Sequence, residues 1–282
     1  MGEKVVEEMS YELKSADALV SELCSYGESK LRVRGPERDF GTPYISFLGG
    51  TEVFGRFVER PFTQGIESQL GLTCINLGCV NAGIDAFLHD EPLMEIAASG
   101  QMTVLQVMGA QNLTNSFYKV HPRRNDRFLR AYDTLAHLFP EVDFTDFNFN
   151  KHLLTSLKAI SEDRFERVCA GLQETWLTRM GRVVDALDGR VVLLWMRYDM
   201  STTDVLGPAP CLVDRSMVDV LRPRVFDVIE LEVTTAGQAQ DIPGMIFGPM
   251  DLPAARLMIG PKEHDRIADV VASRLLKMLS TA

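Results

Sequence analysis

Cysteine is scarce in this 282-residue sequence and follows no recognisable spacing. There are five cysteines, an odd number, and none stands in a CxxC pair. A disulfide framework needs paired cysteines and a zinc ribbon needs two close pairs, so the pattern predicts neither. We expect reduced thiols and no metal site. The cysteines are Cys24, Cys74, Cys79, Cys169 and Cys211.

Basic charge and long apolar runs are also lacking. The chain has 29 Lys and Arg against 39 Asp and Glu, which gives a net charge of −10. Generic nucleic-acid and anionic-membrane binders carry a basic face, so this balance argues against both kinds of partner. No apolar run approaches the roughly 20 residues that span a bilayer, and the N-terminus is acidic without a hydrophobic signal core. We therefore expect a cytoplasmic protein.

Two common nucleotide-binding motifs are missing as well. No GxGxxG follows the first predicted strand, and no GK[ST] occurs anywhere in the chain. Their absence disfavours a Rossmann dinucleotide site and a P-loop. We expect no cofactor.

The sequence does contain a regular alternation of short β-branched runs with longer amphipathic stretches. The runs at residues 44–48, 73–77 and 103–108 each end at or beside glycine, and further runs occupy residues 190–196 and 227–233. Helical spacing marks residues 52–70, 83–99, 153–187 and 262–279, with breaks expected at Pro61 and near Ser161. A strand-like segment at residues 244–250 precedes the last helix. This order predicts an α/β protein: a three-layer, flavodoxin-like α/β/α fold with a mostly parallel sheet of about five strands.

Nothing in the sequence divides the chain into separate folding units. No internal repeat and no Pro/Gly-rich linker occurs, so we predict a single domain at residues 41–282 after an N-terminal arm at residues 1–40. The segment at about residues 115–150 is rich in aromatic and polar side chains. We interpret it as a lid-like insert or as an interface, whose phenylalanines would wall a ligand or form a homodimer contact.

The three glycine-marked strand ends should meet at one crevice, because ligands of open α/β sheets bind beyond the carboxyl ends of the strands. The first end places Thr51 at the start of a helix, followed by the acidic Glu52. The Thr51 hydroxyl is therefore a candidate nucleophile. It is equally well placed to be a simple helix N-cap.

The second and third strand ends supply glycines and neutral amides. Asn81 follows the second strand, and Gln111 and Asn112 follow the third. Such groups suit the stabilisation of an oxyanion in acyl transfer, although amides in loops also commonly bond to neighbouring backbone.

A hydroxyl nucleophile requires a general base, and two histidines are candidates. His264 lies at the start of the last predicted helix, from which it could reach back to the first strand end. His121 is the competing candidate.

Cys79 offers an alternative nucleophile at a glycine-rich strand end. Free cysteine more often packs as a small buried hydrophobe.

Arginines near the proposed crevice indicate an anionic substrate. Arg123 and Arg124 follow His121 and Pro122, and guanidinium groups suit carboxylate, phosphate or sulfate. We expect His121, Arg123 and Arg124 to contact the anion, with Asp126 holding one of the two arginines in place.

These ordered segments resemble the four sequence blocks of the SGNH (GDSL-type) hydrolase superfamily. The blocks are Gly49-Gly50-Thr51, Asn76-Leu77-Gly78 through Gly83, Gly109-Ala110-Gln111-Asn112, and His264. Nearly the whole chain also resembles a bacterial family known only as a domain of unknown function, in FLGGTEVFGRFV, NLGCVNAG, LQVMGAQNL and HPRRNDRFLR.

The SGNH resemblance implies a three-layer α/β/α esterase, thioesterase, deacetylase or acyltransferase. The nucleophile would be Thr51 and the base His264. The oxyanion donors would be Gly78 or Gly83 together with Asn112 or Gln111. The chain departs from the family pattern at three positions: Thr51 replaces serine, Gly50 replaces the acid before it, and Pro261 replaces the aspartate that orients the base.

The sequence therefore predicts a hydrolase or acyltransferase that acts on an ester, acetyl or thioester of a small anionic or carbohydrate-type substrate. The competing interpretation is a binding protein that has lost hydrolysis and keeps an arginine-lined anion pocket. A third, sulfuryl or phosphoryl transfer, lacks the lysine that a phosphate-binding loop supplies.

Overall fold

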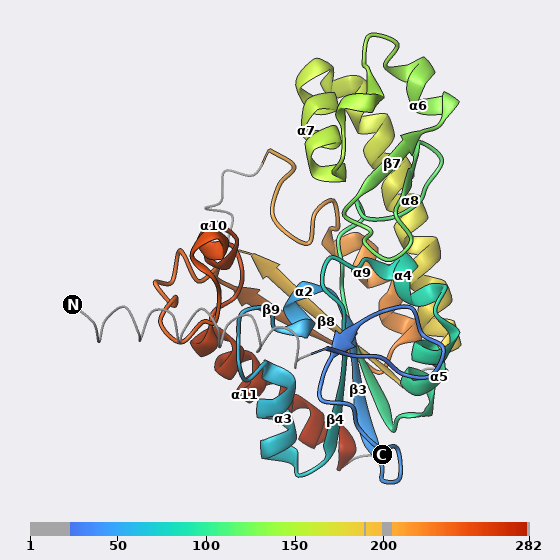
Figure 1. The fold of residues 1–282 in the computed structure, drawn as a ribbon. Helices are drawn as coiled ribbons and strands as arrows, with labels where there is room; N and C mark the ends of the chain where they lie inside the picture. The colour runs from blue at the N-terminus through green and yellow to red at the C-terminus, as the bar shows by residue number, and fades with distance from the viewer. Residues whose placement is uncertain (1–22, 189, 199–204, 281–282) are drawn as a thin grey trace, which may run out of the picture.

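A five-stranded parallel sheet forms the centre of the molecule (Figure 1). The computed structural model describes residues 23–188, 190–198 and 205–280. The central strands are β3 (Tyr44–Gly49), β4 (Thr73–Gly78), β5 (Met102–Gln106), β8 (Val191–Tyr198) and β9 (Asp227–Val233). They lie in the order β4-β3-β5-β8-β9, and each neighbouring pair is parallel. This is the flavodoxin-like strand order, so the predicted fold class is confirmed.

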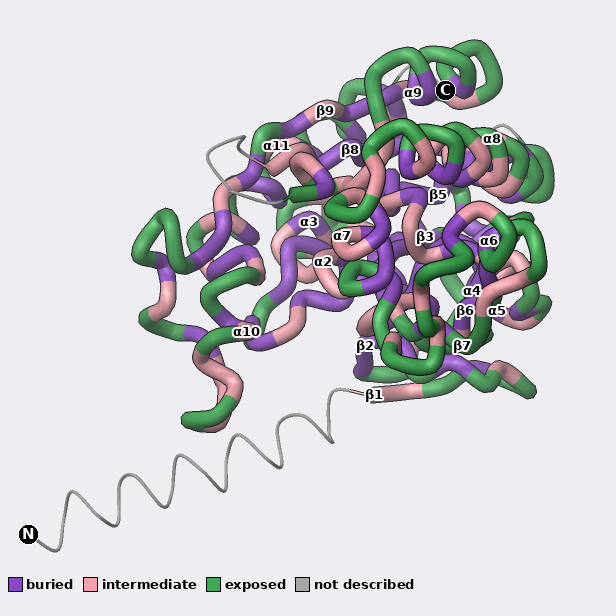
Figure 2. Tube along the Cα trace, turned by 90° about the horizontal axis from the view of Figure 1, so that it is seen from above, coloured by how far each residue is buried: buried purple, intermediate pink, exposed green. Residues whose placement is uncertain are grey.

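Helices cover both faces of the sheet because its strands are apolar on both sides. Ile45 and Phe47 of β3 pack into one core, and Tyr44 and Leu48 pack into the other. The first face carries α3 (Phe62–Leu70) and α11 (Pro261–Leu279). The second carries α4 (Ile84–Leu88), α5 (Glu91–Ser99), α8 (Glu162–Ala186) and α9 (Arg215–Leu221), which continues into η2 (Arg222–Arg224). Figure 2 shows the buried sheet enclosed by helices with exposed outer surfaces.

The helix boundaries follow the signals in the sequence. Pro61 immediately precedes α3, and Ser161 begins α8 by accepting a hydrogen bond from the backbone N–H of Arg164. The prediction of a strand-like segment at residues 244–250 is wrong. Met245 makes only an isolated bridge with Val58, and the chain then forms η3 (Pro249–Asp251) and α10 (Leu252–Arg256). Proline and glycine interrupt this segment, which explains why no ladder forms.

The predicted insert forms a lobe that extends past the carboxyl ends of the central strands (Figure 1). It contains β6 (Tyr118–Val120), β7 (Phe128–Ala131), α6 (Asp133–Leu138) and η1 (Phe144–Asp146). The lobe continues beyond the predicted end of the insert into α7 (Asn150–Ile160), which packs along α8. Phe139 and Leu153 of this lobe are fully buried in the same core as the second sheet face. Its use as a lid stays a prediction.

The described part of the N-terminal arm is tied to the short helix α2 (Thr51–Phe54). β1 (Leu23–Cys24) and β2 (Val33–Arg34) form an antiparallel pair, and residues 1–22 of the predicted arm lie outside the described residues. The Arg34 guanidinium is 3% exposed and donates to four carbonyl oxygens around the C-terminal end of α2. A buried cation is stabilised only when its donors are satisfied, so these bonds hold α2 in place. The acceptors are Phe54, Gly55, Val58 and Glu59, at 3.0 to 3.3 Å.

Across the described parts of the chain, no helix has the length and apolar character that crossing a bilayer requires. The division into an arm and one domain stays a prediction.

Candidate functional site

A cavity of about 150 Å³ opens where the carboxyl ends of β3, β4, β5 and β8 converge, and we call it the Thr51 cavity. The strand order places the topological switch point between β3 and β5, where ligands of doubly wound sheets bind. The structure brings six of the predicted residues to its lining: Thr51, Glu52, Asn81, Gly83, Gln111 and Asn112.

The Thr51 hydroxyl does not cap its helix. Gly50 is the N-cap of α2, and no side chain caps this end. Instead, Thr51 Oγ1 accepts a hydrogen bond of 3.0 Å from the backbone N–H of Asn81. Asn81 adopts a positive φ of 61°, a conformation that asparagine tolerates better than most residues. The N-cap interpretation of Thr51 is therefore wrong, and the hydroxyl is directed to the loop after β4.

A network of buried asparagines orients Asn112. Asn150 Nδ2 donates to Asn112 Oδ1 at 3.0 Å and also to the carbonyl of Asn125. Asn125 in turn accepts the N–H of Gly83 and donates to the carbonyl of His121. Because Asn112 Oδ1 is occupied, its Nδ2 is the free end of the amide, and it has no hydrogen-bond partner among the described residues.

Gly78 and Gly83 do not offer their N–H groups to a ligand. The N–H of Gly78 donates to Asn76 Oδ1, and that of Gly83 donates to Asn125 Oδ1, both at 2.8 Å. A Cβ at Gly78 would lie 2.3 Å from the backbone nitrogen of Phe54, and one at Gly83 would lie 2.5 Å from the backbone carbonyl oxygen of Asn112. The structure thus corrects the expected oxyanion role of both residues. They are glycines because the backbones of neighbouring segments approach so closely there.

His264 is not at the Thr51 cavity, which corrects its assignment as the base. It lies in the first turn of α11, is 1% exposed and stacks on the ring of Phe62. Its Nδ1 accepts the backbone N–H of Phe62 at 3.1 Å. Burial lowers the pKa of His264 to about 3, with the Arg34 charge as a smaller cause. The imidazole is a neutral packing residue between α3 and α11.

We expect His264→Asn to flatten the pH dependence of stability. Asn can still accept the Phe62 N–H, but it does not titrate. The folded-state pKa of His264 is depressed below the unfolded value near 6.5, so only the unfolded chain takes up this proton as pH falls. The wild-type protein should therefore lose about 2 kcal/mol more unfolding free energy than the variant between about pH 7.5 and about pH 5.

Urea unfolding at the two pH values measures this difference. His89→Asn, which removes an exposed histidine, is the matched control and should behave like the wild type. Equal losses in the wild type and in His264→Asn would show that His264 is not buried as a neutral group.

Sequence reasoning missed one acidic residue that the structure places at the Thr51 cavity, Asp126. Asp126, from the insert, lines the cavity, and its Oδ1 is buried without a hydrogen-bond partner among the described residues. Burial raises the pKa of Asp126, while Arg124 at 4.0 Å opposes that shift. The acidic residue in HPRRNDRF was a usable signal, although its position beside two arginines predicted only a partner for one of them.

Glu52 is held by two neighbours that end adjacent strands. Tyr198 donates its hydroxyl to Glu52 Oε1 at 3.2 Å, and Gln106 Nε2 donates to Oε2 at 2.9 Å. Burial and the Glu52 charge together raise the pKa of Tyr198 well above its ordinary value, so the phenol remains protonated. Glu52 is thus a fixed acceptor in the cavity wall.

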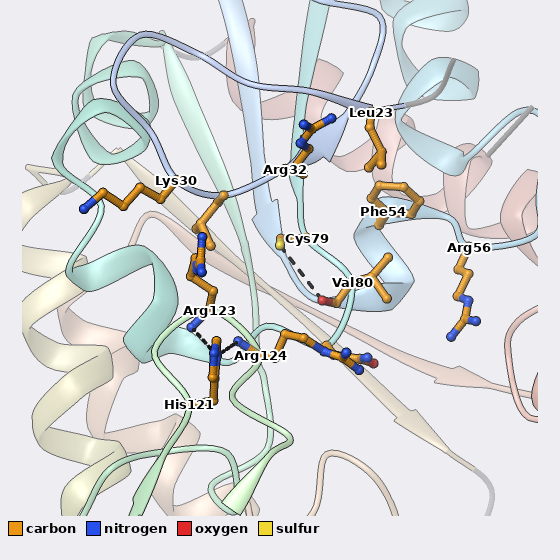
Figure 3. Close-up of a pocket in the computed structure, with 12 residues that line it drawn as sticks. Leu23, Lys30, Arg32, Phe54, Arg56, Cys79, Val80, His121, Arg123 and Arg124 are labelled. Carbon is orange, nitrogen blue, oxygen red and sulfur yellow. Dashed lines mark hydrogen bonds between the residues drawn. The ribbon is translucent and has the colours of Figure 1, made fainter. Parts of the chain in front are cut away.

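A second, larger cavity of about 660 Å³ adjoins the first, and we call it the basic cavity. His121, Arg123 and Arg124 line this cavity and not the Thr51 cavity, at which they were expected, so their contact with an anion stays a prediction. Asn81 lines both cavities. Figure 3 shows the basic side chains arranged around a centre formed by Phe54, Cys79 and Val80. His121 Nδ1 accepts the N–H groups of Arg123 and Arg124, which forms the turn that carries both arginines.

Cys79 is a packing residue of the basic cavity. It is 6% exposed, and burial raises the pKa of its thiol to about 11. At neutral pH almost no thiolate is present, so the alternative nucleophile is corrected to the buried hydrophobe that cysteine usually is. The described residues hold no group of three or more His, Cys, Asp or Glu arranged to bind a metal ion.

Residues 9–279 match the family model described as "Domain of unknown function (DUF6473)". The chain belongs to this family. The predicted resemblance to a family of unknown function is therefore confirmed over nearly the whole length. No curated protein matches the chain.

Among solved structures, the DUF6473 chain is similar to "Salicylyl-Acyltransferase SsfX3 from a Tetracycline Biosynthetic Pathway". The identity is 12%, the TM-score is 0.41, and the match covers 86% of this chain. This chain spans 57% of the length of that structure. A likeness at this level says nothing about activity.

Proposed function

We propose that this protein transfers or hydrolyses the acyl group of an anionic substrate, with Thr51 as the nucleophile. The observation that carries the proposal is the position of the Thr51 hydroxyl. It lies at the switch point of the sheet, accepts the Asn81 N–H, and shares a small cavity with the free amide end of Asn112. A hydroxyl beside preorganised N–H donors suits attack on a carbonyl.

Asp126 is the base in this proposal. Its unpartnered Oδ1 accepts the Thr51 hydroxyl proton, directly or through one water, as Oγ1 forms a bond to the carbonyl carbon. The bond from that carbon to the alcohol or thiol leaving group then breaks, and the leaving group takes the proton from Asp126. Water or an acceptor alcohol releases the acyl group from Thr51 by the same steps in reverse.

The amide donors stabilise the charge that develops during these steps. Asn112 Nδ2 is available to the oxyanion, and the Asn81 N–H stabilises negative charge on Thr51 Oγ1. Donors that are already held in place stabilise the transition state without reorganising. Asn112 is held by Asn150.

The resemblance to SGNH hydrolases enters this proposal for the nucleophile and the oxyanion asparagine. Thr51 stands where the family has serine, and Asn112 where it has the oxyanion asparagine. The base differs, because His264 is buried away from the cavity and Asp126 lines it. We propose a site of this type with a carboxylate base in place of the histidine.

Covalent labelling tests the proposal directly. The protein is incubated with p-nitrophenyl acetate and with an acetyl thioester, and its peptides are examined by mass spectrometry. We expect a mass increase of one acetyl group on the peptide that contains Thr51. Acetylation only at lysines, or none during measurable turnover, would contradict Thr51 as the nucleophile.

The second candidate function is anion binding without turnover. It is favoured by one observation: among the described residues, no histidine lines the Thr51 cavity, whereas five Lys and Arg residues line the adjoining one. In that case the labelling experiment finds no acyl-enzyme and no turnover, while an anion still binds.

A further inference from the structure

The basic cavity has a charge composition opposite to that of the whole protein. The chain carries 39 acidic and 29 basic residues, yet no Asp or Glu is among the described residues that line this cavity. Five of those lining residues are Lys or Arg. They are Lys30, Arg32, Arg56, Arg123 and Arg124. Like charges gathered in this way repel one another, so their convergence is favourable when an anion neutralises them.

These cations come from three separate segments of the chain. Lys30 and Arg32 lie between β1 and β2, Arg56 follows α2, and the arginine pair follows His121 in the insert. Figure 3 shows them spread around Cys79 and Val80, with Lys30 and Arg56 at opposite sides. The fold therefore brings together side chains that are remote in sequence, so the basic composition is not a local charge run.

Most of this charge has no carboxylate partner among the residues that the structure describes. Arg56 lies 3.6 Å from Asp251, and Arg124 lies 4.0 Å from Asp126. Lys30, Arg32 and Arg123 make no ion pair with any carboxylate of the described residues. At least three positive charges are thus available to a ligand. A single carboxylate would neutralise only one of them.

The cavity also has an apolar floor. Leu31, Phe54 and Cys79 line it and are 3%, 2% and 6% exposed. Its volume of about 660 Å³ lies within the range of roughly 300–1,000 Å³ that small-molecule sites occupy. A ligand that fits has several negative charges and an apolar or ring-shaped body.

We propose that the basic cavity binds a phosphorylated small molecule with at least two negative charges. This inference rests on the proposed function in one respect: the ligand is the phosphorylated part of the acyl substrate. Asn81 lines both cavities and donates its N–H to the Thr51 hydroxyl, so it connects the proposed phosphate site with the proposed nucleophile. Lys30 and Arg32, which no sequence motif singled out, become binding residues together with Arg123.

Isothermal titration calorimetry of the full chain tests the inference with three probes. Pyrophosphate supplies the charges alone, ADP adds a ring-shaped body, and acetate is a single-charge control. We expect pyrophosphate and ADP to bind, ADP more tightly because of the apolar floor, and acetate not to bind at the same concentrations. Added NaCl should weaken both interactions, since the cations are exposed.

Three variants locate the site. Arg32→Gln and Arg123→Gln should each weaken ADP binding by about 10-fold or more, because each loses a charged hydrogen bond to phosphate. Arg167→Gln removes an exposed arginine on α8 that lines neither cavity, and its affinity should equal that of the wild type. Absence of binding by both phosphorylated probes, or equal affinity in all three variants, would overturn the inference.

The outcomes for binding and for chemistry can be told apart. Calorimetry needs no turnover. Binding of ADP without formation of acyl-Thr51 would therefore support the phosphate site and contradict the proposed function. Formation of acyl-Thr51 without binding of either phosphorylated probe would support the proposed function and contradict the phosphate site.

Discussion

Replacing Thr51 with valine is expected to lower acyl turnover on the order of 1000-fold, which is the largest effect of any single substitution considered for this protein. Valine keeps the branched shape of threonine and removes the hydroxyl that accepts the Asn81 N–H. Without that oxygen no acyl-enzyme can form. The measurement is kcat/KM for p-nitrophenyl acetate, with the Tm of each variant as a check on folding.

Thr51→Ser is the matched control for this prediction. It keeps the hydroxyl and loses only the methyl group that crowds attack on a carbonyl, so turnover should equal or exceed that of the wild type. Full activity in Thr51→Val would remove Thr51 from the mechanism. Loss of activity in both variants, with unchanged Tm values, would show that the methyl group is needed in addition to the hydroxyl, because valine keeps that methyl group.

Asp126→Asn is expected to lower kcat by about 100-fold or more, because the amide cannot accept the proton of the nucleophile. Burial raises the pKa of Asp126, and the carboxylate is the active form. Wild-type kcat should therefore fall as pH drops through a value above the ordinary 3.8 of aspartate, and it should be level above that value. A pH profile of kcat measures this.

Asp126→Asn should not lower the stability of the protein, although it lowers kcat. A raised pKa in the folded state means that ionisation of Asp126 at neutral pH opposes folding, so the variant should match or exceed the wild-type Tm. Asp146→Asn, at an exposed carboxylate of the same insert that lines neither cavity, is the control and should keep full kcat. A variant at Asp126 with normal kcat would end the assignment of this residue as the base.

The sheet was predictable because its signals are local. The runs predicted at residues 44–48 and 227–233 correspond to β3 (Tyr44–Gly49) and β9 (Asp227–Val233). Strands that are buried on both faces need uninterrupted apolar side chains, and that requirement is visible in any single run. The start of α8 at Ser161 was predictable for a similar reason, since a capping side chain acts within three residues.

The meeting of Thr51, Asn81 and Asn112 was also predictable, although these residues are far apart in sequence. Parallel strands place their carboxyl ends at one edge of the sheet, so the loops after β3, β4 and β5 have to be neighbours. The hydrogen-bond partners within that edge were not predictable. Gly78 and Gly83 were expected to donate to a ligand, but asparagine side chains accept both N–H groups.

What the sequence determined by itself was the layered fold and the set of loops that form the site, because periodicity and strand order act through the backbone. What only the tertiary structure decided was which charged and titratable groups face those loops. His264 is buried by the packing of α11 on α3, where its Nδ1 accepts the backbone N–H of Phe62. Asp126 reaches the Thr51 cavity because buried asparagines fasten the insert to the loops after β4 and β5. Such placements depend on contacts between segments far apart in the chain, and no local pattern of residues records them.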